Sequence, residues 1–132
     1  MESEVIAAAA RATLDGSLPF PEVVRRLIET GVEYYQVDYV ARQKTYYSAS
    51  GEMIKTPIHY EGLPSVAADF DLDALKAAIL DSQQNGQHYR DFTQRAMNAG
   101  VQGYMAFLRG KRVIYWGRGG DSHTEWFPGA NP

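Results

Sequence analysis

The chain has 132 residues, of which 45% are hydrophobic and 22% are charged, a composition that excludes disorder over any long span and suits one domain with one core. Its net charge of −3 argues against a nucleic-acid partner, because the overall field repels phosphate. The absence of cysteine excludes disulfides, thiol nucleophiles and cysteine-bound metals. No apolar run could cross a bilayer and the acidic start lacks the basic region of a signal peptide, so we expect a soluble cytoplasmic protein without a membrane partner.

Two helices are predicted at the start of the chain. The first ends at Asp15 and Gly16, which form a stop signal. The second places apolar side chains at helical spacing, and Gly31 ends it as a left-handed cap. These apolar positions are Val23, Val24, Leu27 and Ile28.

An alternating segment, VEYYQVDYV at 32–40, follows and predicts a strand with one buried face. The strand is expected to pair in a hairpin that turns near Arg42 and Gln43. Residues 56–71 contain two prolines and a glycine. They are therefore predicted to form a short edge strand and then a connecting loop.

The second half of the chain predicts the same succession of elements. Asp71 can cap a helix that ends at Asn85 and Gly86, and a further helix ends at Gly100. A hairpin that turns at 109–111 follows. Each half therefore reads as helix, helix and hairpin, with a third short strand.

The two halves align without a gap. Residues 20–35 match 89–104 at a spacing of 69 residues, from Gly31 to Gly100. The pattern predicts an α+β fold in which an internally duplicated helix-helix-β-hairpin unit, at approximately 3–58 and 72–127, forms one mostly antiparallel sheet with helices packed on it. Chance likeness between two helix-glycine-strand units is the alternative. Each half alone would bury too little apolar surface to fold independently, so we expect 1–132 to fold as a single domain.

The segment that looks most like a reaction site is YWGRGGDSHTEWFP, at 115–128. If it is extended, Asp121, His123 and Glu125 share one face. A histidine between two carboxylates suits acid/base catalysis or metal ligation, so these three are the candidate catalytic residues of a hydrolase. The alternatives are a partner-docking face and an exposed edge strand whose charges block pairing. We assign no metal site, and the cofactor, if one exists, is unknown.

The same region mixes basic and aromatic side chains. Arg112, Tyr115, Trp116 and Arg118 are candidate ligand-binding residues, because rings can stack on a ligand and guanidinium groups can hold an anion. Binding of single-stranded nucleic acid is a weaker hypothesis, since the chain as a whole is acidic. A small molecule or a protein would also fit these residue types.

Aromatic residues are expected on both faces of the sheet. Helices can cover one face, but Tyr34, Met105 and Phe107 belong to the other. Something must cover such a surface, and we expect a homodimer because two-fold pairing is the commonest oligomer.

The chain also resembles a known family. The residues that carry the likeness are Gly-Val-x-x-Tyr-x-Val-Asp-Tyr at 31–39, Gly-Lys-Arg-Val-x-Tyr-x-Gly-Arg at 110–118 and Gly-Asp-x-His-x-Glu-x-Phe-Pro at 120–128. They resemble small bacterial and prophage proteins of a domain-of-unknown-function family often labelled "phage envelope protein". The resemblance implies a phage association and no particular activity. We therefore expect a small binding or interaction module without catalysis, with the hydrolase as the alternative.

Overall fold

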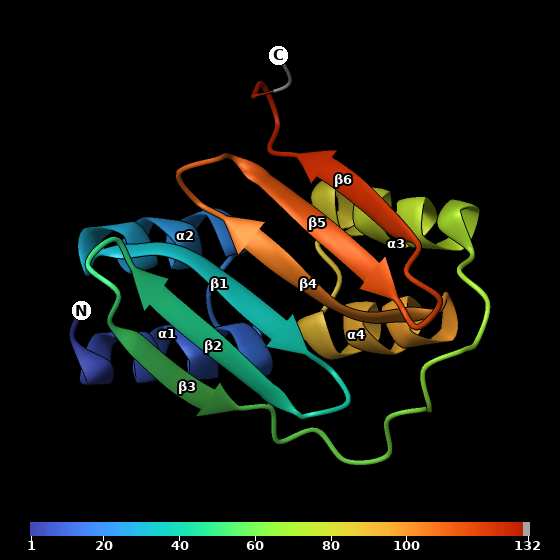
Figure 1. Ribbon diagram of the computed structural model, residues 1–132, viewed down its shortest axis with the longest axis horizontal. Helices are drawn as coiled ribbons and strands as arrows, with labels where there is room; N and C mark the ends of the chain where they lie inside the picture. Colours follow the sequence, from blue (N-terminus) through green and yellow to red (C-terminus); the bar gives the residue numbers. More distant parts are fainter. Residues whose placement is uncertain (131–132) are drawn as a thin grey trace.

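The computed structural model describes residues 1–130, and it confirms the α+β prediction. Within these residues, six strands form one antiparallel sheet and four helices pack on it (Figure 1). The elements are α1 (Ser3–Asp15), α2 (Phe20–Glu29), β1 (Val32–Asp38), β2 (Gln43–Ser48), β3 (Met53–Pro57), α3 (Leu72–Asn85), α4 (Tyr89–Asn98), β4 (Val101–Phe107), β5 (Arg112–Gly117) and β6 (Ser122–Trp126).

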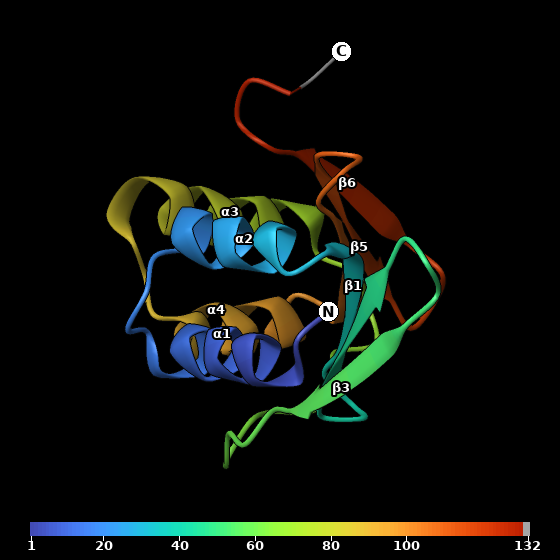
Figure 2. The same cartoon turned by 90° about the vertical axis from the view of Figure 1, so that its left-hand side faces the viewer.

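All the helices lie on the same side of the sheet. Figure 2 shows the sheet edge-on, with α1 to α4 in one layer and no helix on the opposite side. The structure is therefore a two-layer arrangement in which one face of the sheet is covered. We call the covered face the inner face and the other one the outer face.

The sheet has the strand order β3-β2-β1-β4-β5-β6. Its centre is the antiparallel pair of β1 and β4, in which Tyr34 lies opposite Phe107. The first three strands extend from this centre in one direction and the last three extend in the other (Figure 1). The two halves of the chain thus share one sheet.

The elements recur along the chain at a constant spacing. β1 and β4 begin at Val32 and Val101, which are 69 residues apart, the spacing that separates Gly31 from Gly100. The backbone angle φ is +93° at Gly31 and +91° at Gly100, so both helix stops have the left-handed conformation that favours glycine. Descent of the halves from one duplicated unit stays a prediction.

The helix ends follow local signals in the sequence. The side chain of Asp71 caps α3 by accepting a hydrogen bond of 3.0 Å from the backbone N–H of Ala74. Gly16 and Gly86 end α1 and α3 in the left-handed region. No helix within residues 1–130 combines the length and the apolar character needed to span a bilayer.

The core lies between the helices and the inner face of the sheet. Helix α1 contributes Ile6 and Ala9, and α3 contributes Leu75, all of them buried. The strands and the residue that follows β1 contribute an unusual set of buried polar and aromatic residues, among which Tyr39, Lys44 and Tyr46 are at most 2% exposed. A lysine in this position calls for a physical explanation, because burial of an unpaired charge is unfavourable.

Candidate functional site

The strand register arranges the side chains of the sheet in rows. Residues directly opposite one another on neighbouring strands point to the same face, so each row can be followed across all the strands. The outer row consists of Met53, Tyr47, Tyr34, Phe107, Arg112 and Trp126. The inner row, beneath the helices, consists of Thr56, Lys44, Val37, Tyr104, Tyr115 and His123.

Two of the three candidate catalytic residues lie together on strand β6. His123 Nε2 is 3.0 Å from Glu125 Oε1, and both side chains are partly buried on the inner face. The His123 ring also stacks on Tyr115, with ring centroids 6.5 Å apart. The histidine and the second carboxylate therefore form a pair at one edge of the sheet.

Asp121 is placed differently. It precedes β6, its side chain is exposed, and its backbone carbonyl accepts a hydrogen bond of 2.9 Å from the N–H of Gly117. Within the described chain, no three His, Asp or Glu side chains are grouped closely enough to hold a metal ion. The three predicted residues therefore do not form a ligand set by themselves, and the hydrolase hypothesis stays a prediction.

The candidate ligand-binding residues are divided between the two faces. Tyr115 is buried on the inner face, whereas Arg112 and Trp116 are half-buried on the outer face. The guanidinium group of Arg118 donates a hydrogen bond of 3.2 Å to the backbone carbonyl of Val66. The structure thus brings Arg112 and Trp116 to one surface, and Arg118 ties the connecting segment to the end of β5.

The outer row is a continuous line of large side chains. The rings of Tyr34 and Tyr47 are stacked with centroids 4.8 Å apart, and Phe107 stacks on Tyr34 at 6.1 Å. The guanidinium carbon of Arg112 lies 4.7 Å from the centroid of the Trp126 ring, a cation–π contact. Aromatic contacts therefore lie on both sides of the sheet centre within this row.

Both tryptophans of the chain lie on this face. The ring of Trp116 lies over Gly103, where an added Cβ would be only 2.5 Å from it. The absence of a side chain at Gly103 therefore lets the indole lie flat on the sheet. Intrinsic tryptophan fluorescence will report directly on anything that covers the outer face.

The inner row contains a lysine that forms no ion pair within residues 1–130. Lys44 is 2% exposed, and its ammonium nitrogen lies 4.4 Å from the centroid of the Tyr89 ring of α4. Burial, with no charged or hydrogen-bonding partner to oppose it, lowers the pKa of Lys44 to about 7. At neutral pH the amine is therefore partly neutral inside the core.

Several hydroxyl groups are buried in the same core. The hydroxyls of Tyr89 and Tyr104 are 2.7 Å apart and form a hydrogen bond. Three other buried hydroxyls, on Tyr39, Thr56 and Thr93, form no hydrogen bond of normal geometry within the described part of the chain. Tyr89 and Thr93 are nevertheless close enough to the Tyr39 hydroxyl, and Thr56 to that of Tyr46, to oppose in part the rise in pKa that burial causes. Buried hydroxyls are normally paired in folded proteins, so the polar groups of this core are the second feature of interest.

Sequence reasoning missed Lys44 because a lysine beside a hairpin turn looks exposed. Strand alternation could have found it, since Lys44 precedes Tyr46 by two residues and must share its face. The repeat spacing gives a second signal. The residue 69 positions later is Val113, which is also buried, so the position belongs to the core in both halves.

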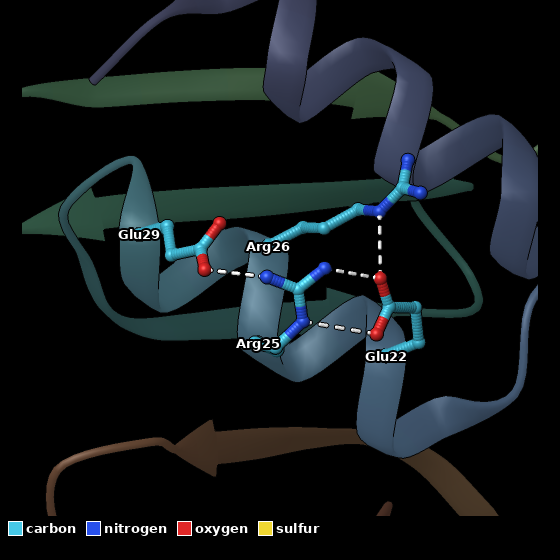
Figure 3. Close-up of polar contacts among 4 residues, drawn as sticks. All are labelled: Glu22, Arg25, Arg26 and Glu29. Atoms are coloured by element: carbon cyan, nitrogen blue, oxygen red, sulfur yellow. Dashed lines mark hydrogen bonds and ion pairs between the residues drawn. The ribbon is translucent and has the colours of Figure 1, made fainter.

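A cluster of charges lies on α2. Figure 3 shows Glu22, Arg25, Arg26 and Glu29 linked along one side of the helix by ion pairs. Hydrogen bonds from the Arg25 and then the Arg26 guanidinium lower the pKa of Glu22 to about 2. Because the arginine side chains are about half exposed, this is a solvated helix surface that contributes little to stability.

Comparison with protein families places the chain in a known group. A family model described as "Protein of unknown function (DUF1398)" matches residues 6–124. No curated protein matches the chain significantly.

Proposed function

The chain belongs to this family of proteins of unknown function, and from that premise we propose that it is a binding module whose outer face docks a second copy of the same chain. The observation that carries the proposal is the outer row. It places apolar or aromatic side chains and one arginine in an unbroken line on the face that no helix covers.

The composition of the outer face supports a protein partner. Interfaces are enriched in aromatic residues, methionine and arginine, and depleted in lysine and acidic residues. Besides the outer row, this face carries Met105, Ile114 and Trp116, together with the charged Asp38 and Lys55 and the uncharged polar residues Gln36, Gln43, Thr45 and Thr124. Association with a partner removes exposed apolar surface of this kind from water, which is favourable.

The size and charge of the face support a second copy as that partner. A sheet of six strands, about 4.8 Å apart and about 20 Å long, offers roughly 550 Å² per copy, or about 1,100 Å² in total, which is near the lower limit for a specific interface. Arg112 and Lys55 are balanced in part by Asp38, so like-charge repulsion between two copies is weak. Face-to-face packing of two sheets is a common arrangement.

We expect the wild-type chain to have the mass of a dimer in light scattering at micromolar concentration. Phe107→Arg should raise the dissociation constant at least about 30-fold, because it places a charge at the centre of the row, where truncation of a hot-spot residue already costs 2 kcal/mol or more. On dilution of the wild type, the fluorescence of Trp116 and Trp126 should shift to longer wavelength as the rings meet water.

Leu80→Arg is the matched control. Leu80 is an apolar residue of α3 that is 50% exposed, and it lies in the helix layer, so its replacement should leave the dimer intact. Circular dichroism establishes that both variants fold. A wild-type mass of one chain, or equal effects of the two variants, would exclude the outer face as a self-association surface.

Other parts of the prediction rest on the resemblance or on the residues alone. A phage association, a cytoplasmic location and a small molecule or a different protein as ligand stay predictions. The hydrolase alternative is reduced to His123 and Glu125, whose contact of 3.0 Å would suit a proton-transfer pair.

A further inference from the structure

We propose that the groove where β1 begins is a docking site for a short extended peptide of a partner protein, with small apolar side chains and one acidic residue. The groove has a volume of about 340 Å³ and is open to solvent. Its lining residues are Ile28, Gly31, Val32, Glu33, Leu108 and Arg109. A peptide is the expected occupant because the chain covers the corresponding place in its second half with a peptide segment of its own.

The two ends of the central strand pair have the same geometry. The N–H of Leu108 donates to the carbonyl of Glu33 at 3.0 Å, and the N–H of Tyr39 donates to the carbonyl of Gln102 at 2.8 Å. Donors and acceptors of the two bonds are each 69 residues apart in the chain. The place that corresponds to the groove is therefore the one where α4 ends and β4 begins.

The connecting segment between β3 and α3, drawn in green in Figure 1, covers that place in the second half. The N–H of Ala67 donates to the carbonyl of Met97 at 3.0 Å. The backbone oxygen of Asp69 lies so close to Gly100 that an added Cβ would be 2.2 Å from it. The neighbouring side chain of Val66 is buried, so this segment packs on the end of α4 as an integral part of the core.

In the first half the corresponding place is only partly covered. The N–H of Glu2, 69 residues before Asp71, donates to the hydroxyl of Thr30 at 2.9 Å. Ile28, however, is 52% exposed, against 2% for its counterpart Met97. In the part of the chain that the structure describes, no segment crosses the groove to donate to the Ile28 carbonyl. An apolar side chain and a backbone acceptor are therefore open where the second half holds a peptide.

The residues of the groove suit an occupant with the composition of residues 66–69, which is VAAD. Val32 and Leu108 are buried apolar residues of its lining, against which small apolar side chains can pack. At the rim, exposed Arg109 contacts Glu33 at 3.4 Å. A guanidinium group has five N–H donors, so Arg109 has donors left for an acidic residue of the peptide. Backbone hydrogen bonds to an extended segment would add to the affinity.

A synthetic peptide of residues 64–71, PSVAADFD, blocked at both ends and labelled with fluorescein, is the probe. The chain's own segment is held covalently in the second-half place, so a free peptide competes poorly there and the groove is its expected site. Fluorescence anisotropy should show saturable binding with a dissociation constant of about 10 to 500 μM, as a small contact allows. A peptide of the same residues in scrambled order should bind at least about 10-fold more weakly.

Ile28→Glu should weaken binding of the PSVAADFD peptide at least about 10-fold, because it places a charge in the apolar groove beside Glu33. The matched control is Leu80→Glu. Leu80 is 50% exposed and belongs to α3, so this variant should bind the peptide like the wild type. Circular dichroism establishes that both variants fold.

The test is independent of self-association through the outer face. Neither Ile28 nor Leu80 belongs to the outer row, so both variants should keep the wild-type mass in light scattering. Three results would each overturn the peptide groove: no saturable binding to the wild type, equal affinities of Ile28→Glu and the wild type, or equal affinities of the ordered and scrambled peptides.

Nuclear magnetic resonance locates the bound peptide without a variant. In a chain labelled with ¹⁵N, the peptide should shift the amide signals of Gly31 and Val32 and leave those of Gly100 and Val101 unchanged. Shifts at Gly100 in place of Gly31 would mean that the peptide displaces the connecting segment, and they would contradict docking in the groove.

Discussion

Lys44→Met is expected to raise the free energy of unfolding at pH 7 by about 4 kcal/mol. In the folded chain burial lowers the pKa of this amine from 10.5 to about 7, and each unit of such a shift corresponds to about 1.4 kcal/mol between the two charge states. Methionine has a similar length and no charge, so it removes this unfavourable term and keeps the packing.

The pH dependence of this difference gives the sharper test. Between pH 7 and 10.5 the unfolded chain holds a proton on Lys44 that the folded chain lacks, so the stability of the wild type rises with pH through this window. The methionine variant lacks this rise. Its advantage should therefore be largest at or below about pH 7 and decrease steadily toward pH 10.

Buried tyrosines act in the opposite direction and at higher pH. Burial raises the pKa of Tyr46 to about 12 and raises those of Tyr89 and Tyr104 well above 10. The unfolded chain ionises first, so stability falls above about pH 10 in both proteins and cancels in the difference. Urea unfolding of the wild type and of Lys44→Met at several pH values measures this difference in the free energy of unfolding. A methionine variant less stable than the wild type at pH 7 would contradict the buried, unpaired amine.

Gly100→Ala is expected to lower the free energy of unfolding by roughly 2 to 5 kcal/mol. A Cβ at Gly100 would lie 2.2 Å from the backbone oxygen of Asp69, so the connecting segment would have to move. That segment is anchored here by backbone hydrogen bonds of Asp71 to Ala99 at 2.7 Å and of Ala67 to Met97 at 3.0 Å. Both bonds would be strained by the movement.

Gly31→Ala is the control that separates two causes. Gly31 has nearly the same positive φ as Gly100, but the atom nearest to an added Cβ is 4.0 Å away, in the flexible side chain of Met1. This variant should lose only the roughly 1 to 2 kcal/mol of the left-handed conformation. Urea unfolding at neutral pH compares the two. Equal losses of unfolding free energy in the two variants would mean that the close approach of Asp69 adds nothing to the effect of the substitution at Gly100.

The elements of the fold were largely predictable because their signals are local. The helix stops at Gly31 and Gly100 and the turn at 109–111 were read from glycine positions, and all of them appear in the structure. The strand at 32–40 was read from alternation, and it also appears, although it ends at Asp38. The α+β class follows from the succession of these elements.

The candidate sites were predictable only in part. Alternation correctly put His123 and Glu125 on one face of β6, but it extended the strand to Asp121, which lies in the preceding turn. Alternation also puts Tyr115 and Trp116 on opposite faces, so the candidate ligand-binding residues could not all converge from one strand. Lys44 was missed because the residue type was given more weight than its position in the strand.

The order of the elements, the faces of the strands and the positions of the glycine stops were determined by the sequence itself, since each depends on neighbours a few residues away. Which face of the sheet is shielded from solvent was decided only by the packing of four helices on the same side of it (Figure 2). That packing buried Lys44 beneath Tyr89 and left the outer row open. The reason is physical, because the environment of a side chain depends on what the rest of the chain brings over it, and periodicity along a single strand does not contain that information.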